Sequence, residues 1–179
     1  MVVVYSVMWP QDAAGGVARK PLGWWPPRFG PTELMGNWKP PTFSVDANIG
    51  PVDLQPNDAG VLLVSAKMMT VLDTMRAPSD RIEWLPVALS CGDRTVDYFI
   101  PHLLDALDVV DTTRSVLNPR TGSVIKAHLR ADAVGEHRVF TYSNSTGLIL
   151  LVTKDVYKAL SGCSGCYFSR LRVSGPEGQ

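Results

Sequence analysis

The sequence predicts an α+β fold built on a mixed, largely antiparallel sheet. Twice along the chain, a short apolar run leads into a Ser or Thr and then into apolar residues at helical spacing, which predicts two strand–helix–strand units. Between these units, apolar runs separated by turn residues predict an antiparallel hairpin. Before residue 60 the chain is rich in proline and tryptophan, which predicts an irregular segment. Two such units around a hairpin are typical of a sheet covered by helices.

Length and composition fit one domain. The chain has 179 residues, of which 45% are hydrophobic and 19% charged, and chains divide into several domains mostly above about 250 residues. We therefore expect a single domain over residues 1–179, with an N-terminal segment at 1–59, a regular body at 60–173 and a tail at 174–179. The 17 basic and 17 acidic residues balance, so no charge excess indicates a nucleic-acid partner.

Membrane and secretory segments are not expected. Apolar runs fall short of the roughly 18 residues of a membrane span. The apolar start at residues 2–8 has no positive leader, and its Val-rich composition predicts a strand. An odd number of cysteines, three, argues against a disulfide framework. These features predict a cytoplasmic protein, and the sequence indicates no cofactor.

The N-terminal segment is predicted to dock on the body. Nine of the 14 prolines lie between Pro10 and Pro56, and proline at this density prevents regular hydrogen-bonded structure. A disordered linker would be poor in tryptophan, whereas this segment contains four of the five tryptophans. Trp24, Trp25 and Trp38 are therefore expected either to cover the core or to anchor a binding partner.

The first unit begins with an apolar strand at residues 60–64. Ser65 is predicted to cap a helix that ends near Arg76, because the following apolar residues recur at helical spacing. The next strand, at residues 82–89, contains Pro86, which favours a sheet edge or a bulge. Further along the chain we predict a turn at 91–93, a strand at 95–100, a short helix at 102–107 that starts after Pro101, an extended piece at 109–111, strands at 124–129 and 138–142 with a hairpin turn at 134–137, and a turn at 143–146.

The second unit repeats this order near the end of the chain. It comprises a strand at residues 147–152, a helix from the cap Thr153 to Gly162, and a strand at residues 166–173. Its residues 150–153 match residues 62–65 of the first unit. The match is compatible with an internal duplication and equally with a common unit used twice.

Catalytic motifs are missing from the sequence. It contains no nucleophile elbow, phosphate-binding loop or metalloprotease motif, and its histidines are scattered. The neighbours Glu136 and His137 are expected on a turn, facing solvent. Cys163 and Cys166 have the spacing of a metal or redox pair, but the chain has no second pair for zinc, and this pair follows a helix instead of preceding one. We therefore predict neither catalytic nor metal-binding residues.

Charged residues are unevenly distributed between residues 93 and 130. Five acids and one base lie at 93–111, whereas four bases and no acid lie at 112–130. Internal ion pairs on a solvated surface are one interpretation. The other is an acidic surface that steers a basic partner, with Asp105, Asp108 and Asp111 as partner-binding residues.

The order of elements from residue 60 to residue 173 resembles one family of bacterial immunity proteins. The likeness consists of a strand and serine-capped helix like residues 63–72, a strand like 82–87, a stretch like 98–101 leading to 110–115, a strand like 139–141, a capped helix after 151–153 and an aromatic strand like 165–168. This is immunity family eleven of the polymorphic toxin systems, formerly a domain of unknown function. The resemblance implies a protein that lacks catalytic residues and neutralises a toxin made by its own cell.

Different classes of function remain open from the sequence. The first is an immunity protein that inhibits a cognate toxin by direct binding, with no nucleic-acid or membrane partner. The alternative is an enzyme whose active site is assembled from scattered polar residues, namely Asp111, Ser115, His102 and His128. A third is a chaperone or adaptor for an effector. The oligomeric state does not follow from the sequence.

Overall fold

The structure is a computed structural model that describes residues 2–10, 16–27, 29, 33–48, 50–143 and 149–175. Within these residues, most strands belong to two five-stranded sheets. The first sheet has the order β2 (Thr42–Val45), β5 (Ile82–Cys91), β6 (Arg94–Leu103), β4 (Leu63–Ser65) and β3 (Leu54–Gln55). The second has the order β13 (Tyr167–Arg170), β1 (Val4–Met8), β12 (Leu150–Thr153), β11 (Val139–Tyr142) and β7 (Ala106–Leu107).

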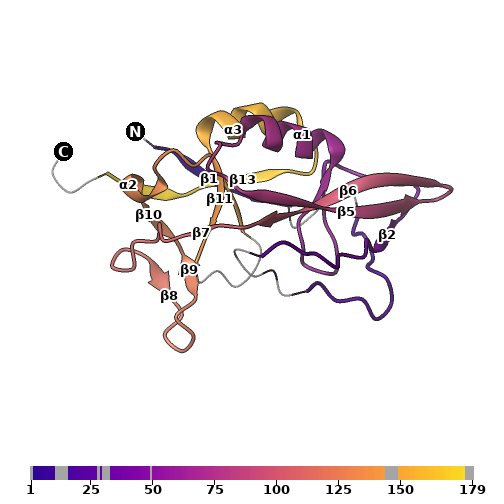
Figure 1. Cartoon of the computed structure of the whole chain (residues 1–179), viewed down its shortest axis with the longest axis horizontal. Helices are drawn as coiled ribbons and strands as arrows, with labels where there is room; N and C mark the ends of the chain where they lie inside the picture. The colour runs from indigo at the N-terminus through magenta and orange to yellow at the C-terminus, as the bar shows by residue number, and fades with distance from the viewer. Residues whose placement is uncertain are drawn as a thin grey trace.

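Smaller elements complete the described structure. Two two-stranded sheets pair β8 (Val116–Leu117) with β9 (Val124–Lys126) and β10 (His128–Arg130) with β14 (Arg172–Ser174). The helices are α1 (Ala66–Met75), α2 (Ala131–Val134) and α3 (Lys154–Ala159), the last extended by a 3-10 turn at Leu160–Gly162. Figure 1 shows α1 and α3 side by side on one side of the strands. The predicted α+β class with a largely antiparallel mixed sheet is confirmed.

Both strand–helix–strand units share one topology. α1 connects β4 to β5, and β6 lies between these two strands and antiparallel to both. α3 connects β12 to β13, and β1 lies between them in the same way. Residues 62–65 and 150–153, which match in sequence, therefore occupy equivalent places. In the first unit the middle strand is β6, which follows β5 in a hairpin. In the second unit the middle strand is β1, which comes from the N-terminal part of the chain.

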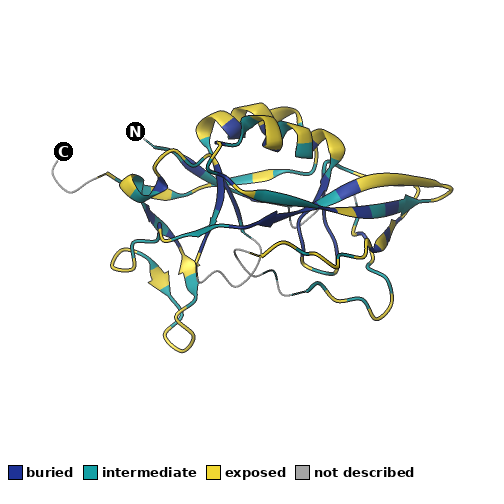
Figure 2. Ribbon diagram, in the orientation of Figure 1, coloured by how far each residue is buried: buried dark blue, intermediate teal, exposed yellow. Residues whose placement is uncertain are grey.

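The apolar core is continuous beneath the two helices. There, a cluster that we call the helix-side cluster unites both sheets: Val7, Leu54, Leu62, Val64, Met68, Leu72, Leu103, Val139, Leu150, Val152, Val156 and Leu160. Side chains alternate along a strand, so Leu63 and Leu151 face the opposite side. There the N-terminal segment covers the first sheet, and the chain around β10 and α2 covers the second. Figure 2 shows the buried residues concentrated on the strands.

Two prolines lie inside strands at positions that need no ladder donor. Pro86 belongs to β5 and Pro101 to β6, and the register of the β5–β6 hairpin directs the backbone nitrogen of each outward, away from the partner strand. The outer neighbours do not reach them, because β2 pairs only from Ala88 onward and β4 only up to Phe99. Pro86 therefore occupies a local edge of a strand that is otherwise internal, as proline requires.

The helix predicted at residues 102–107 is wrong. β6 continues to Leu103, and β7 then carries the chain into the second sheet beside β11. Pro101 permits a helix start but does not impose one, and pairing with β5 buries His102 and Leu103.

Other predicted boundaries also shift. The strand predicted at 124–129 is two strands, β9 and β10, and the strand predicted at 166–173 is β13 and β14. The helix α2 precedes the turn predicted at 134–137. Residues 144–148, with most of the predicted turn at 143–146, lie outside the described residues.

After β1, which lies inside the second sheet, the described part of the N-terminal segment is mostly without regular structure and packs on the first sheet. It also contributes β2, parallel to β5, and β3, antiparallel to β4, neither of which the sequence predicted. β2 is short and follows Pro40 and Pro41, so local propensity gave little sign of it. Its pairing with β5 provides the hydrogen bonds that its own neighbours do not.

Candidate functional site

Arginines pair with two of the three aspartates that were predicted to bind a partner, Asp105 and Asp108. Asp105 accepts two hydrogen bonds from Arg81, at 2.9 Å from Nε to Oδ2 and at 2.5 Å from Nη2 to Oδ1. These bonds lower the pKa of Asp105 below its ordinary value. Asp108 lies 3.2 Å from Nη2 of Arg130, and its side chain is 91% exposed. Asp108 is thus the accessible carboxylate of the predicted three.

Asp111 holds a turn. Its Oδ1 accepts hydrogen bonds from the hydroxyl of Thr113 at 2.7 Å and from the backbone N–H groups of Thr113 and Arg114 at 3.0 and 3.2 Å. The Thr113 hydroxyl bond makes the largest contribution to a lowered pKa of Asp111. This is the turn geometry that aspartate favours. Asp111 therefore orients the chain that leads into β8.

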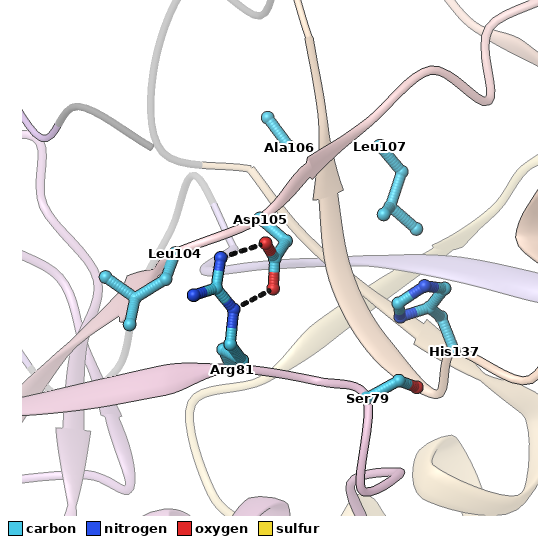
Figure 3. A pocket seen from close by; sticks show the side chains of 7 residues that line it. All are labelled: Ser79, Arg81, Leu104, Asp105, Ala106, Leu107 and His137. Carbon is cyan, nitrogen blue, oxygen red and sulfur yellow. Dashed lines mark hydrogen bonds and ion pairs between the residues drawn. The ribbon is translucent and has the colours of Figure 1, made fainter. Parts of the chain in front are cut away.

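The Arg81–Asp105 pair lies at an open hollow of about 540 Å³. Figure 3 shows the two side chains pointing toward each other there. The hollow is lined by Ser79, Arg81, Leu104, Asp105, Ala106, Leu107 and His137. The guanidinium of Arg81 and the carboxylate of Asp105 hydrogen-bond to each other. The charges in the lining are therefore already paired, and neither is left to bind the charge of a ligand.

A buried carboxylate lies next to this hollow. The side chain of Asp80 is fully buried, and it accepts hydrogen bonds from the N–H groups of Ala77 and Val139 at 2.8 and 2.9 Å. Nδ1 of His137 lies 2.7 Å from its other oxygen. The expectation that His137 faces solvent on a hairpin turn is therefore wrong, because its side chain is only 22% exposed. Asp80 joins the end of α1 to the start of β11.

The Asp80–His137 pair does not continue into a catalytic relay among the described residues. In such a relay, the second ring nitrogen of the histidine takes a proton from a nucleophile. The nearby hydroxyl of Ser79 is buried and makes no hydrogen bond to another described residue. The pair therefore supports a structural role in this geometry.

The four polar residues of the enzyme hypothesis do not form one site. His102 is 1% exposed, lies in the first sheet and is 2.8 Å from Glu83, which also accepts the backbone N–H of Met35. Asp111, Ser115 and His128 do lie together, beside the second sheet. Their contacts involve the backbone of His128, whose N–H donates to Ser115 Oγ at 2.9 Å and whose carbonyl accepts from the Asp111 N–H at 2.8 Å. These contacts hold the loop before β8 against β10, and the imidazole ring of His128 takes no part in them.

Two of the three predicted tryptophan anchors cover the core. The ring of Trp24 packs edge-on against Trp38 and Phe43, at centroid distances of 6.4 and 5.4 Å. Nε1 of Trp38 donates a 2.8 Å hydrogen bond to the carbonyl of Pro86. Both rings thus fasten the N-terminal segment to the first sheet and fill the face opposite the helices.

Trp25, in contrast, is presented to solvent. Its exposed fraction is 73%, and neighbouring Leu22 is fully exposed. Leu22 lies on a tight turn at residues 21–24, which is closed by a 3.0 Å hydrogen bond from the N–H of Trp24 to the carbonyl of Pro21, and Trp25 directly follows this turn. Gly23 has φ +75° at the third position of this turn, as a type II turn requires. The ammonium group of Lys20 lies 3.7 Å from the centre of the Trp25 ring.

Burial disfavours the thiolate form of both cysteines in the pair Cys163 and Cys166. Burial raises the pKa of Cys166 to about 12 and also raises the pKa of Cys163. A reactive or ligating cysteine needs its thiolate form, and these environments oppose it. Cys166 Sγ lies 3.9 Å from Sδ of Met68 in the core. The described part of the chain holds no group of three side chains arranged for a metal.

Three buried or half-buried polar links escaped the sequence analysis: Asp53, Asp80 and the pair of Glu83 with His102. Asp53 lies in the proline-rich segment, and Asp80 follows Pro78 and Ser79, so both had the local sequence of an exposed turn. Glu83 and His102 are direct cross-strand partners in the β5–β6 hairpin. Such partners share one face of a sheet, so a correct strand register would have brought the two side chains together. Neighbouring residues in the sequence do not indicate that Asp53, Asp80 and the Glu83–His102 pair link distant segments of the chain.

None of the helices among the described residues has the length and apolar character needed to span a bilayer. A family model described as the immunity protein family Imm11 matches residues 17–171, which is most of the chain. That range includes most of the N-terminal segment as well as the body from residue 60 onward. Among curated proteins, none matches this sequence.

Proposed function

The chain belongs to the immunity protein family Imm11, and from this premise we propose that it is a toxin-neutralising protein of a polymorphic toxin system. In this proposal it acts in the bacterial cytoplasm, where it binds one cognate toxin and blocks it by direct contact. The observation that carries the proposal is the family match over residues 17–171. The match covers both the segment that presents Trp25 and the regular body.

The arrangement of polar groups supports binding over catalysis. The conspicuous titratable side chains described above are engaged in contacts that hold loops and strands together: Asp53, Asp80, Glu83, His102, Asp105, Asp111 and His137. A general acid or base must instead reach a substrate. We therefore propose that the protein has no enzymatic activity.

The proposed contact surface includes the exposed segment at residues 21–25. Trp25 and Leu22 project from this segment, whose shape is held by Gly23 and by the anchored ring of Trp24. A rigid, exposed tryptophan can bury a large area at low entropic cost. Of the predicted acidic contacts, we retain Asp108 as a direct one, because its carboxylate is the most exposed.

The other predicted contact residues receive supporting roles in this proposal. Trp24 and Trp38 position the turn through their packing on the first sheet. Asp105 and Asp111 stabilise the chain on either side of Asp108 through Arg81 and Thr113. Their replacement should alter binding indirectly, through local order.

Co-expression with the toxin encoded by the adjacent gene tests the proposal. We expect full rescue of growth and a complex with a dissociation constant of about 1 nM or tighter, equivalent to about −12 kcal/mol. A toxin that stays lethal although both proteins are made would contradict neutralisation. If the pair binds and the toxin remains active, the adaptor function is the better explanation.

A single-residue change tests the proposed anchor. Trp25→Ala should weaken the complex by tenfold or more, mainly through faster dissociation, because the ring is exposed and its loss leaves the core intact. Tyr167→Ala serves as the matched control, since Tyr167 is a 53% exposed aromatic residue on β13. Equal effects of the two changes on binding would remove Trp25 as an anchor.

A further inference from the structure

A hairpin at residues 116–126 projects from the body on the side opposite α1 and α3 (Figure 1). It consists of β8, β9 and the loop between them, and it forms a two-stranded sheet of its own. Outside its inner contacts, the hairpin is exposed, as Figure 2 shows. We call this element the β8–β9 arm. The arm contributes no residue to the helix-side cluster.

Side-chain and backbone bonds hold the tip of the arm in one shape. Oδ1 of Asn118 accepts the N–H groups of Arg120 and Thr121 at 2.9 and 3.2 Å. The carbonyl of Asn118 accepts the N–H of Gly122 at 2.8 Å, and Gly122 has φ +69°. The N–H of Asn118 closes the loop on Ser123, also at 2.8 Å. Arg120 is therefore presented at a turn that is already ordered, which lowers the entropic cost of binding.

The two faces of the arm differ. Leu117 pairs with Val124, and Val124 packs against the core beneath the second sheet. Paired residues share a face, so the next pair, Val116 with Lys126, lies on the outer side. The register shift between Val116 and Leu117 leaves Ile125 as the extra residue. Val116 and Ile125 are 51% and 65% exposed, which gives the arm an apolar outer surface.

The arm also carries positive charge that no acidic residue in the described part of the chain compensates through an ion pair. Residues 112–130 contain four bases and no acid. At the base of this stretch, Arg114 lies 3.7 Å from Asp111 and Arg130 lies 3.2 Å from Asp108. Arg120 and Lys126, on the arm itself, form no ion pair with another described residue. The exposed outer surface is thus both apolar and cationic.

We propose that the β8–β9 arm is a contact element for an acidic surface of the cognate toxin. The proposal rests on the neutralising function proposed above and names the charge of the partner. Arg120 meets carboxylates of the toxin, Lys126 adds to the attraction, and Val116 with Ile125 buries apolar area between them. Charge complementarity of this kind raises the association rate and fixes orientation. The part of the toxin surface that meets the arm is therefore acidic, and Asp108, proposed above as a direct contact, meets a different part of the toxin.

A nucleic acid is a less suitable occupant of the same surface. Nucleic-acid surfaces usually gather several phosphate contacts or aromatic rings that stack on bases. The arm offers two cations without a described ion-pair partner, Arg120 at its tip and Lys126 on its outer face, beside two aliphatic side chains, and the chain as a whole is neutral. These features match a protein surface with carboxylates around an apolar patch.

Charge reversal on the arm tests the proposal with the toxin encoded by the adjacent gene as the probe. The variant Arg120→Glu with Lys126→Glu should slow association about tenfold or more at low salt and weaken its dependence on salt. Ile125→Asp should speed dissociation. The control, Lys154→Glu with Lys158→Glu on α3, changes the net charge equally on exposed residues of the helix layer and should bind like the wild type. Circular dichroism verifies folding, and Arg120→Ala is the milder variant if the reversal disturbs the hairpin.

The outcomes separate this inference from the proposed function. A wild-type chain that binds and neutralises the toxin, with arm variants that bind equally well, overturns the inference alone. Equal losses in the arm and α3 variants also overturn it, because the effect would then follow net charge. If the arm variants keep toxin binding but lose binding to a single-stranded oligonucleotide, the arm belongs to a nucleic-acid contact and the inference fails. Failure of the wild type to bind the toxin contradicts both proposals.

Discussion

Asp53 shows how single polar residues connect distant parts of this chain. Its carboxylate accepts hydrogen bonds from the Ser65 hydroxyl at 2.6 Å, from the Ser164 N–H at 2.8 Å and from Lys67 Nζ at 3.3 Å. The first and third come from α1 and its cap, and the second comes from the loop after α3. Asp53 thus holds the N-terminal segment to both strand–helix–strand units.

The pKa of Asp53 predicts acid sensitivity. Burial by itself would raise this pKa, but the hydrogen bonds from Ser65, Ser164 and Lys67 lower it below its ordinary value. A lowered folded-state pKa stabilises the protein above the unfolded value of about 4, and this contribution is lost as pH falls through the folded-state pKa. Urea unfolding at pH 6 and near pH 3 should therefore show a smaller acid-induced loss of stability in Asp53→Asn than in the wild type.

A matched change on the surface controls for general acid effects. Asp97→Asn alters an exposed carboxylate on β6. It should leave the acid-induced loss of unfolding free energy close to that of the wild type. If Asp53→Asn loses as much stability in acid as the wild type does, the contacts of Asp53 do not favour its ionised form.

In both strand–helix–strand units the helix follows a strand that ends in a hydroxyl-bearing cap residue, but the two caps differ in their hydrogen bonds. Ser65 Oγ accepts the N–H of Met68 at 3.2 Å and donates to Asp53, so it satisfies a free helix donor and anchors the N-terminal segment at once. Thr153 stands at the same place before α3, yet its side chain makes no capping hydrogen bond. The predicted cap positions are both right, whereas the capping bond exists only at Ser65.

This difference predicts unequal costs for the same substitution. Ser65→Ala should lower the free energy of unfolding by about 1–2 kcal/mol, because it removes a cap and a partner of Asp53. Thr153→Ala should cost less, roughly 0.5 kcal/mol or below, since no capping bond is lost. Chemical denaturation of the two variants measures the difference. A cost for Thr153→Ala that equals or exceeds the cost for Ser65→Ala would contradict this assignment.

The two main sheets share one core. The helix-side cluster contains Val64 and Leu72 of the first unit together with Val152 and Leu160 of the second. The chain also passes from β6 in the first sheet directly to β7 in the second. Neither unit can therefore keep its helix-side face buried without the other.

A shared core predicts that the sheets unfold together. Leu160→Ala removes a fully buried side chain at the 3-10 turn that follows α3 and should cost about 2–5 kcal/mol. We expect amide hydrogen exchange to accelerate in β4 and β6 of the first sheet as well as in β11 and β12 of the second. Acceleration confined to the second sheet would show two independent folding units. Leu117→Ala in the β8–β9 arm, outside this cluster, should leave both sheets protected.

Local features of this protein were determined by sequence alone. The Ser65 cap, the helix through Met75, the hairpin turn around Gly92 and the strands β5 and β12 all follow from residues only a few positions apart. Capping, turn conformation and side-chain periodicity depend on the local backbone, so they can be read without a fold. The family likeness was visible for the same reason, because it is an ordered series of such elements.

Only the tertiary structure decided which polar groups meet and which apolar groups stay outside. Asp105 pairs with Arg81 across 24 positions, Asp80 with His137 across 57, and Asp53 with Ser164 across 111. The same holds for the tryptophans, because Trp24 and Trp25 are neighbours in sequence but only Trp25 is exposed. Burial and ion pairing depend on which surfaces the packed sheets bring together, and sequence distance carries little information about that packing.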